Sequence, residues 1–477
     1  MQATKTIADK DAMPTFLKWG MAFLTFYTVN QLHFPQSLGV PGLNVLNLIC
    51  LVLWISHTRT GRRNDVKPVM RMRLFALFGA LIYAFLLAQA TLPGEFMIDV
   101  NYLKASIFYP IYFFMFFYVV RTEDDIRFIM YACLFVALIA GLEAFKEGLA
   151  YGNLTFNVAK RASGPFGEDA STANRAGIFF SMFFCLAMAV ILYHPEPGNR
   201  WIRWTAMFAV FALLAGTFYT FSRQSYIIVV VIGALMMFRR GPVLIIVLAI
   251  AAGGYQFWVP EAAIDRLSDT QQVDEDGVEI VDDSTSSRWV QWEAAGRMIQ
   301  DQPWGIGFNR FKDLSEGYGG KKDLDAHNHY VLFATEAGPL GLIIHLTLVF
   351  SLLWTAHRYF RLSKRRQNPL GRTLSSAFLF MTIAMILGNI YGSPFSNGEV
   401  MGLYWALGGL MARHMYSLRK EDQPFRSAIP TIPEGEVPPV GAADVPDMPR
   451  GRTRPRRRGR RQGNVPGVPV TATLRPE

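Results

Sequence analysis

The sequence predicts an all-α, polytopic membrane protein with about twelve transmembrane helices and one large outer loop that contains short amphipathic helices. Of its 477 residues, 51% are hydrophobic and 18% are charged, whereas a soluble domain carries about 25% charged residues. The apolar residues gather in runs of about 20, the length that a helix needs to cross a ~30 Å hydrocarbon core. Short basic links separate these runs. The pattern excludes a soluble globular enzyme and a secreted disulfide scaffold.

Twelve apolar runs are interpreted as spans. Their approximate limits are 15–32, 41–57, 74–92, 103–120, 127–149, 174–193, 204–221, 225–238, 242–259, 332–356, 373–391 and 400–416. If the N-terminus is inside, the Arg-rich links 58–73 and 357–372 both fall on the cytoplasmic side, as the positive-inside rule requires. We therefore expect both termini to be cytoplasmic.

The net charge of +10 does not by itself indicate nucleic-acid binding, because Lys and Arg accumulate in the cytoplasmic loops of membrane proteins. The three cysteines, Cys50, Cys133 and Cys185, lie inside apolar runs. The sequence therefore predicts no disulfide framework and no zinc site.

A long outer loop is expected at 260–331, where 15 acidic residues outnumber 7 basic ones. Its segment Asp269–Asp283 is acidic and is predicted to be a mobile loop. Its segment Ser286–Gln300 has apolar residues at helical spacing and is predicted to be an amphipathic helix. Ser286 or Ser287 is the expected N-cap.

The C-terminal segment 417–477 holds eleven prolines and a dense run of arginines. Few of its residues can build a core, so it is predicted to be a disordered tail beside a membrane domain at 1–416. Nucleic-acid binding is one use for such a tail. Binding to anionic lipid headgroups is favoured, because the tail is tethered at a membrane.

Three arginines on the outer side are candidate anion ligands. Arg223 lies on a tight turn between two apolar runs, although a basic residue at a helix end can also snorkel to the interface. Arg161 lies in a Gly/Pro loop that is suited to binding an anion, but the same loop is equally typical of a protein surface without a ligand. Arg288 opens the amphipathic helix, where its charge opposes the helix dipole unless an anion binds there too.

Two histidines lie just before a later span, at its predicted outer end, in the sequence Asp325-Ala326-His327-Asn328-His329-Tyr330. A histidine offers a titratable base, and Asn328 beside it offers an amide that could orient a hydroxyl. A metal held by Asp325, His327 and His329 is an alternative, but no fourth ligand is evident. Glu336, inside the following apolar run, is a functional candidate because a carboxyl group at membrane depth is costly.

Taken in order, these pieces resemble the O-antigen ligase and polymerase superfamily of bacterial envelope proteins. The resemblance is carried by the motifs Ser222-Arg223, Ser287-Arg288 with Trp292, Asp301-Gln302-Pro303-Trp304-Gly305-Ile306-Gly307, Ala326-His327-Asn328-His329-Tyr330 and Glu336-Ala337-Gly338-Pro339-Leu340-Gly341. It is close over about 220–345, and the helix count and the outer loop extend it to about 15–416.

The resemblance implies an inverting glycosyltransferase that needs no metal or other cofactor and works at the periplasmic face of the bacterial inner membrane. Such enzymes move a glycan from an undecaprenyl-pyrophosphate carrier to lipid A-core, to another carrier-linked glycan or to a protein hydroxyl. When the roles of the family's residues are carried over to the matching positions of this sequence, His327 is the catalytic base and Arg223 and Arg288 hold the pyrophosphate. Arg161 is a further candidate for holding the pyrophosphate. Residues expected to support the site are Asn328, His329, Glu336, Gly305 and Gly307.

The favoured function is therefore an O-antigen ligase-type transferase in cell-surface polysaccharide synthesis, such as that of lipopolysaccharide or exopolysaccharide. A polymerase of the same superfamily, which extends the carrier-linked chain, is the first alternative. A twelve-span transporter or flippase is an alternative from another class. Transporters usually show repeated halves and polar sites at the membrane midplane, whereas this sequence shows no repeat and gathers its polar motifs on one face.

Overall fold

The computed structural model describes most of the predicted membrane domain and the end of the predicted outer loop. The described residues are 12–35, 44–61, 66–152, 160–167, 172–196, 198–238, 271–273, 279–281 and 283–420. The predicted span at 242–259 and residues 421–477 of the predicted tail lie outside them, whereas residues 417–420, also assigned to the tail, are helical.

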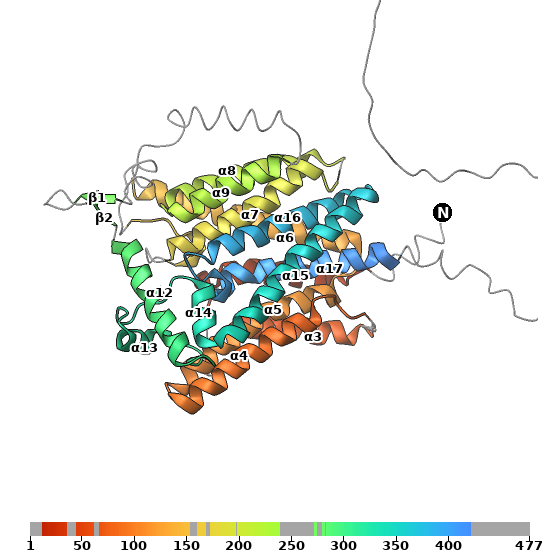
Figure 1. Cartoon of the computed structure of the whole chain (residues 1–477). Helices are drawn as coiled ribbons and strands as arrows, with labels where there is room; N and C mark the ends of the chain where they lie inside the picture. The colour runs from red at the N-terminus through yellow and green to blue at the C-terminus, as the bar shows by residue number, and fades with distance from the viewer. Residues whose placement is uncertain are drawn as a thin grey trace, which may run out of the picture. The chain divides into compact units, whose positions relative to one another are not determined.

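The described residues are largely helical (Figure 1). The α-helices are α2 Thr15–Val29, α3 Val45–Arg59, α4 Arg71–Thr91, α5 Phe96–Val119, α6 Glu123–Ala150, α7 Ala173–Tyr193, α8 Arg200–Tyr219, α9 Arg223–Phe238, α12 Asp283–Asp301, α13 Phe311–Leu314, α14 His329–Glu336, α15 Gly338–Arg365, α16 Pro369–Gly388 and α17 Gly398–Lys420. Short 3-10 helices are η1 Gln31–His33, η2 Gly164–Phe166, η4 Ser315–Tyr318 and η5 Pro394–Ser396.

Seven of the described helices are long and apolar enough to cross a membrane, namely α4, α5, α6, α7, α8, α15 and α16. Helices α3 and α9 are apolar but shorter. The all-helical, membrane-spanning class is therefore confirmed. The remaining predicted spans in the described residues also fall on helices, but these helices are too short or not apolar enough to be counted as spans, so the count of twelve stays a prediction.

The predicted run 332–356 is two helices rather than one. Helix α14 ends at Glu336, and α15 begins at Gly338, whose φ of +73° is in the left-handed region. A Cβ atom on Gly338 would lie 2.9 Å from the carbonyl carbon of Trp304, so the close approach also requires glycine there. As a result Glu336 belongs to a short helix that precedes the membrane-spanning segment.

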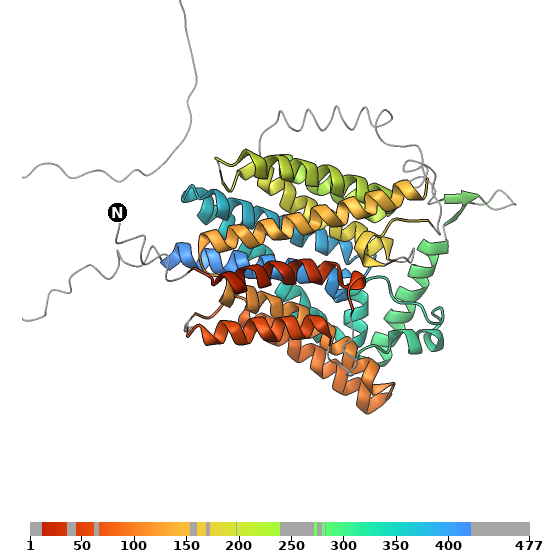
Figure 2. The ribbon, with the colours of Figure 1, turned by 180° about the vertical axis from the view of Figure 1, so that it is seen from behind.

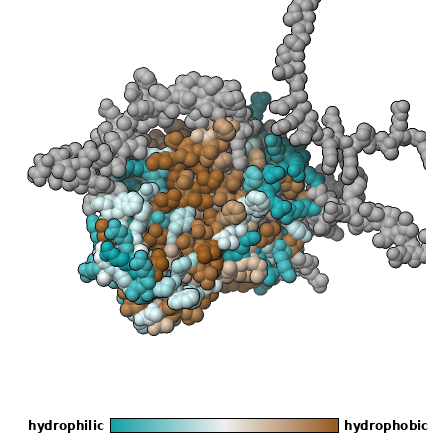
Figure 3. Space-filling view, in the orientation of Figure 1, coloured by the Kyte–Doolittle hydropathy of each residue, from teal (hydrophilic) through white to brown (hydrophobic). Residues whose placement is uncertain are grey.

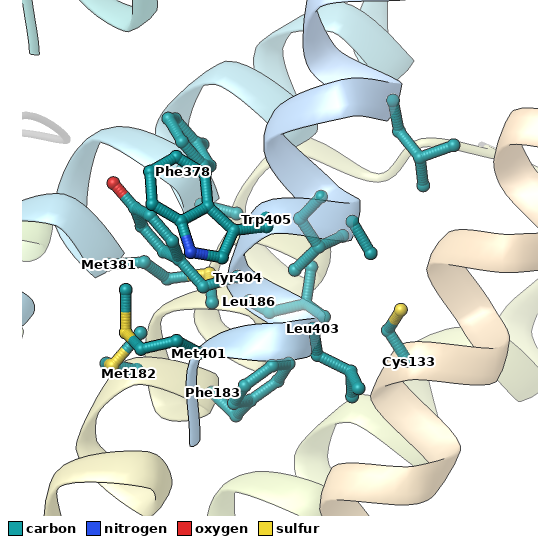
Figure 4. Packing of buried hydrophobic residues seen from close by; sticks show 14 of the residues in the cluster. Cys133, Met182, Phe183, Leu186, Phe378, Met381, Met401, Leu403, Tyr404 and Trp405 are labelled. Carbon is teal, nitrogen blue, oxygen red and sulfur yellow. The ribbon is translucent and has the colours of Figure 1, made fainter. Parts of the chain in front are cut away.

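Helix α17 packs among α5, α2 and α16 (Figures 1 and 2). Its glycines allow close packing, since a Cβ atom on Gly409 would lie 2.4 Å from the carbonyl oxygen of Phe113 on α5. On the side of α16, the ring of Tyr404 stacks on that of Phe378 with centroids 4.7 Å apart, and Trp405 is fully buried beside them (Figure 4). The surface of the bundle shows a hydrophobic band between two more hydrophilic ends (Figure 3), as a bilayer requires.

The outer loop contributes α12, which confirms the predicted amphipathic helix. This helix begins at Asp283, so the prediction of Ser286 or Ser287 as its cap is wrong, and both serines lie inside the helix. An acidic residue at a helix start is favourable because of the helix dipole. Strands β1 Gln271–Val273 and β2 Glu279–Val281 pair antiparallel, so these residues of the acidic segment form a hairpin instead of the expected loop.

Candidate functional site

A polar cavity of about 360 Å³ lies where α12, α13 and α14 meet the ends of α5, α7 and α9 and the link between α16 and α17. Its polar and charged lining residues are Tyr102, Ser106, Asn174, Arg175, Gln224, Arg288, Asn309, Lys312, Asp325, His327, Glu336, Tyr391, Ser393, Ser396 and Asn397. The cavity therefore joins residues from segments far apart in the sequence, including two of the predicted site residues, Arg288 and His327, and the supporting candidate Glu336.

Helix α12 is held against the cavity by its aromatic side chains. The indole Nε1 of Trp292 donates a hydrogen bond of 2.8 Å to the carbonyl oxygen of Ala326. The Trp292 ring also lies 6.1 Å from the ring of Tyr391, and the guanidinium of Arg288 lies 5.6 Å from the same tyrosine ring. These contacts fix the first turns of α12 so that Arg288 lines the cavity with His327.

The backbone at His327 is fixed on both sides. The carbonyl oxygen of Ala326 accepts the Trp292 bond, and the side chain of Asn328 caps α14 by accepting hydrogen bonds from the N–H groups of Tyr330 and Val331. His327 itself has a φ of +48°, a left-handed conformation that is costly for a residue with a side chain. Asn328 therefore supports the site through the backbone, as a helix cap.

His329 has a different environment from His327. Its ring is buried, lies 4.8 Å from the ring of His345 and 5.2 Å from that of Phe395, and does not line the polar cavity. Its N–H donates to the carbonyl oxygens of Asn389 and Gly392, which ties α14 to the end of α16. Asp325 and His327 line the polar cavity without His329, so the three side chains of the alternative metal site are not gathered there, and no cluster of three possible metal-ligating side chains occurs among the residues that the structure describes.

The electrostatic surroundings of His327 favour a neutral imidazole. Burial lowers the pKa of His327 from its ordinary value near 6.5, Arg288 and Lys312 lower that pKa further, and Asp325 opposes them by raising it. A histidine with a lowered pKa is unprotonated at neutral pH. His327 is thus able to accept a proton inside a cavity that also presents cationic side chains.

Glu336 is a buried carboxyl group at the inner wall of the cavity. Burial raises its pKa to about 8 and the charge of Asp325 acts in the same direction, although the nearby backbone N–H groups of Asn309, Phe311 and Arg310 lower the pKa. At neutral pH this carboxyl group is therefore largely protonated.

Gly305 and Gly307 bring the loop before α13 close to α14 and α4. Their φ values are +102° and +97°. A Cβ atom on Gly305 would lie 2.6 Å from the carbonyl oxygen of Glu336, and one on Gly307 would lie 2.5 Å from the Cα atom of Ala88. Gly307 N also donates to that Glu336 carbonyl at 3.1 Å. Both positions need glycine for conformation and for space.

A buried ion pair between Arg310 and Asp99 holds the loop to α5. Arg310 donates from Nη1 to Asp99 at 2.9 Å, from Nη2 to the other carboxylate oxygen, and from Nε to the carbonyl oxygen of Leu92 at 2.7 Å. Asn309 and Gln89 donate to the same carboxylate. The two charged side chains are 2% and 1% exposed. Sequence patterns did not indicate this pair, because its members are about 200 residues apart and belong to no motif.

We expect Arg310→Ala to destabilise the protein strongly, because it leaves the Asp99 carboxylate buried without its cation. The free energy of unfolding should fall by about 3–5 kcal/mol. A lower melting temperature of the detergent-purified protein would reveal this loss. Arg297→Ala is the control, since Arg297 is 58% exposed. Replacing both partners by Leu and Met should recover part of the loss. An unchanged melting temperature for Arg310→Ala would contradict this role.

The other two predicted arginines do not line the cavity. Arg223 is the first residue of α9, and the next residue, Gln224, reaches the cavity and donates to the carbonyl oxygens of Leu387 and Gly388. Arg161 donates from Nε to the carbonyl oxygen of Thr220 at 2.8 Å and from Nη2 to Asn174 Oδ1 at 2.6 Å. These bonds join the turn before α9 to the start of α7, so Arg161 holds neighbouring elements together.

Two further cations line the cavity, Arg175 and Lys312. The pair Asn174-Arg175 follows the basic loop that contains Arg161, so its sequence position was a usable signal. Lys312 carried no such signal, because it lies in an acidic loop and its approach to His327 depends on the folding of that loop. The cavity therefore presents more positive charge than the sequence motifs indicated.

Comparison with known proteins shows that part of the chain is similar to a known family. Residues 208–346 match the family model described as O-antigen ligase, which covers the chain from α8 to the beginning of α15 and includes Arg223, Arg288 and His327. No curated protein matches the chain. The match confirms the resemblance to the O-antigen ligase and polymerase superfamily, whose members are glycosyltransferase-like enzymes, and together with the apolar helices it indicates a multi-pass membrane protein.

Proposed function

Since residues 208–346 carry the O-antigen ligase signature, we propose that the protein is a membrane glycosyltransferase that moves a glycan from an undecaprenyl-pyrophosphate carrier to an acceptor hydroxyl. The observation that carries the proposal is the cavity whose lining His327 shares with three cations, Arg288, Arg175 and Lys312. An unprotonated histidine beside several cations suits a reaction that releases a proton from one substrate and a pyrophosphate from the other.

The proposed reaction is a single displacement. The acceptor oxygen attacks the anomeric carbon, its proton passes to the imidazole of His327, and the bond from that carbon to the pyrophosphate oxygen breaks. The carrier leaves as the lipid pyrophosphate, and the anomeric configuration is inverted. Negative charge grows on the leaving oxygen, so a guanidinium already placed there stabilises the transition state more than the ground state.

The residues divide between contact with the substrates and positioning. Arg288 is the proposed pyrophosphate ligand with the most direct support, because it lines the cavity with His327. Arg223, at the start of α9, is proposed as a second ligand, supported by its neighbour Gln224 in the lining. Arg161 is proposed to position the α8–α9 turn through its bonds to Thr220 and Asn174.

The test of the function is a reaction of the purified protein with carrier-linked glycan. Lipid A-core, a protein acceptor and a second carrier-linked glycan are supplied in separate reactions, and each product is identified by mass. Transfer to lipid A-core identifies the favoured ligase, and elongation of the carrier-linked chain identifies a polymerase. If radiolabelled donor crosses a vesicle membrane unchanged and no acceptor is modified, the transferase proposal is wrong and the transporter alternative replaces it.

The pH dependence should follow the neighbours of His327. Protonated His327 cannot accept a proton, so kcat/KM should fall as the pH drops through its pKa, which lies below 6.5. Lys312→Gln removes a charge that lowers this pKa, so the acidic limb of the kcat/KM profile should move to higher pH. Asp325→Asn removes a charge that raises it, so the limb should move to lower pH. The measurement is kcat/KM from pH 5 to 8, and shifts with the opposite signs would contradict the assignment of the limb to His327.

The proposed setting is the bacterial inner membrane, with residues 1–416 as the transferase domain, the loop 260–331 in the periplasm and both termini in the cytoplasm. The tail at 417–477 is proposed to contact anionic lipid headgroups. Single cysteines at 280 and 365 in a cysteine-free protein test the orientation. An impermeant reagent should label position 280 in intact spheroplasts, and labelling at 365 instead would reverse the orientation.

A further inference from the structure

A second, apolar cavity of about 630 Å³ lies between α4 and α15. We call it the α4–α15 groove, and its lining residues are Ala76, Gly79, Ala80, Tyr83, Pro303, Trp304, Ala337, Gly338, Pro339, Leu340, Gly341, Ile343 and Ile344. Of the described residues that line it, none is charged. Several are alanine or glycine, so the groove exists because neither helix fills the space between them.

The groove begins beside the polar cavity and descends along α4. Tyr83 donates a hydrogen bond of 3.0 Å to the carbonyl oxygen of Trp304, which closes the end nearest the outer loop. Ala337 in the groove follows Glu336, which lines the polar cavity. From Tyr83 to Ala76 the groove follows α4 for about 10 Å, at a rise of ~1.5 Å per residue.

The cations of the polar cavity lie on other elements. Arg175 is on α7, Arg288 is on α12 and Lys312 is on α13, whereas the groove belongs to α4 and α15. Helix α4 packs against α5 and α15, at the opposite side of the bundle from α7 and α9 (Figure 1). If Arg288 and Arg223 hold the pyrophosphate, as proposed above, the carrier chain starts from the α9 side of the cavity, and the uncharged groove is left for the other substrate.

We propose that the α4–α15 groove binds a hydrocarbon chain of a lipid-anchored acceptor. The inference rests on the proposed transferase function and narrows it, because it makes the acceptor a membrane lipid that carries a glycan. The chain in the groove holds the acceptor beside Glu336, so that its sugar hydroxyl lies in the cavity with His327. Since the surrounding lipid is equally apolar, the groove acts by positioning this chain and not by burying it from water.

The test fills the groove without disturbing the bundle. Ala76 and Gly79 are exposed positions of α4 that line the groove, and a Cβ atom added to Gly79 meets no atom within 4 Å. In the variant Ala76→Leu with Gly79→Leu, the KM for a lipid-anchored acceptor should rise roughly tenfold, the effect of a few methylene groups in an apolar pocket. Ala90→Leu is the matched control, because Ala90 is an exposed alanine of the same helix that does not line the groove.

Two comparisons separate the possible occupants. With a short, lipid-free saccharide as acceptor, the filled variant and the wild type should turn over at the same rate. A rise in the KM for the donor alone would show that the carrier chain uses the groove, and unchanged constants for both substrates would show that only bulk lipid fills it. Either result overturns the proposal.

Binding provides a measurement that does not depend on turnover. Native mass spectrometry of the detergent-purified protein with the lipid-anchored acceptor should show a bound lipid on the wild type and on Ala90→Leu, and a loss of about tenfold in affinity on the filled variant. If the wild type transfers no glycan but this pattern is found, the transferase function fails and the lipid site remains. If transfer occurs and the filled variant binds normally, the lipid site fails and the function remains.

Discussion

His327→Ala should lower turnover by about 100- to 10,000-fold, the usual contribution of a positioned general base. The ring lines the cavity with Arg288, burial lowers its pKa, and the backbone on either side is fixed by the Trp292 bond and the Asn328 cap. The change therefore removes the proton acceptor while the surrounding loop keeps its anchors. The measurement is single-turnover transfer by purified proteins at equal folded concentration.

His33→Ala is the control for this experiment, because the His33 side chain is 52% exposed and does not line the cavity. It should react at the wild-type rate. If His327→Ala also keeps near wild-type turnover, the assignment of His327 as the base is wrong. A variant that loses turnover together with its folded fraction would be replaced by His327→Gln, which keeps a side chain of similar polarity.

Arg288→Ala should lower turnover by roughly 10- to 100-fold, because a hydrogen bond to a charged group contributes about 1.5–3 kcal/mol. Arg288→Lys should restore little of the lost turnover, since an ammonium group cannot reproduce the two parallel hydrogen bonds of a guanidinium. Chelators should leave the rate unchanged, because the proposed mechanism stabilises the leaving pyrophosphate with arginine. Rates of the three proteins with the same donor provide the measurement.

Arg297→Ala is the matched control for Arg288, since both arginines lie on α12 and Arg297 is exposed and outside the cavity lining. Equal losses in the two variants would assign the effect to the charge of α12 as a whole. A loss reversed by added divalent metal after chelation would contradict the metal-free mechanism.

Much of the helical framework was predictable, because a membrane span requires a long apolar run whatever it packs against. The exception is the run 332–356, where the Gly338-Pro339 break divides α14 from α15. The Gly338-Pro339 break is visible in the sequence, but the apolar residues on both sides of it favoured a single span, and the contact between Gly338 and Trp304 shows why the chain must turn there.

The candidate site was predictable where its residues belong to local motifs. Arg288 and His327 were both indicated by sequence and meet in one cavity. Arg161 was also indicated, but the direction of its side chain depends on where the α8–α9 turn lies, which no local pattern specifies. The approach of Lys312 depends on the Arg310–Asp99 pair, a contact between distant segments that periodicity cannot reveal.

The central place of α17 has a consequence for the synthesis of the protein. Chains are made from the N-terminus, so α17 is the last described helix to enter the membrane, yet it packs between α2, α5 and α16. Its neighbours must leave room until it arrives, and the glycines at 402 and 409 let it fit closely against them. The link before α17 also supplies part of the cavity wall, including Ser396 and Asn397. The cavity is therefore incomplete until α17 has been made, and the proposed transfer reaction can begin only after translation of the membrane domain has ended.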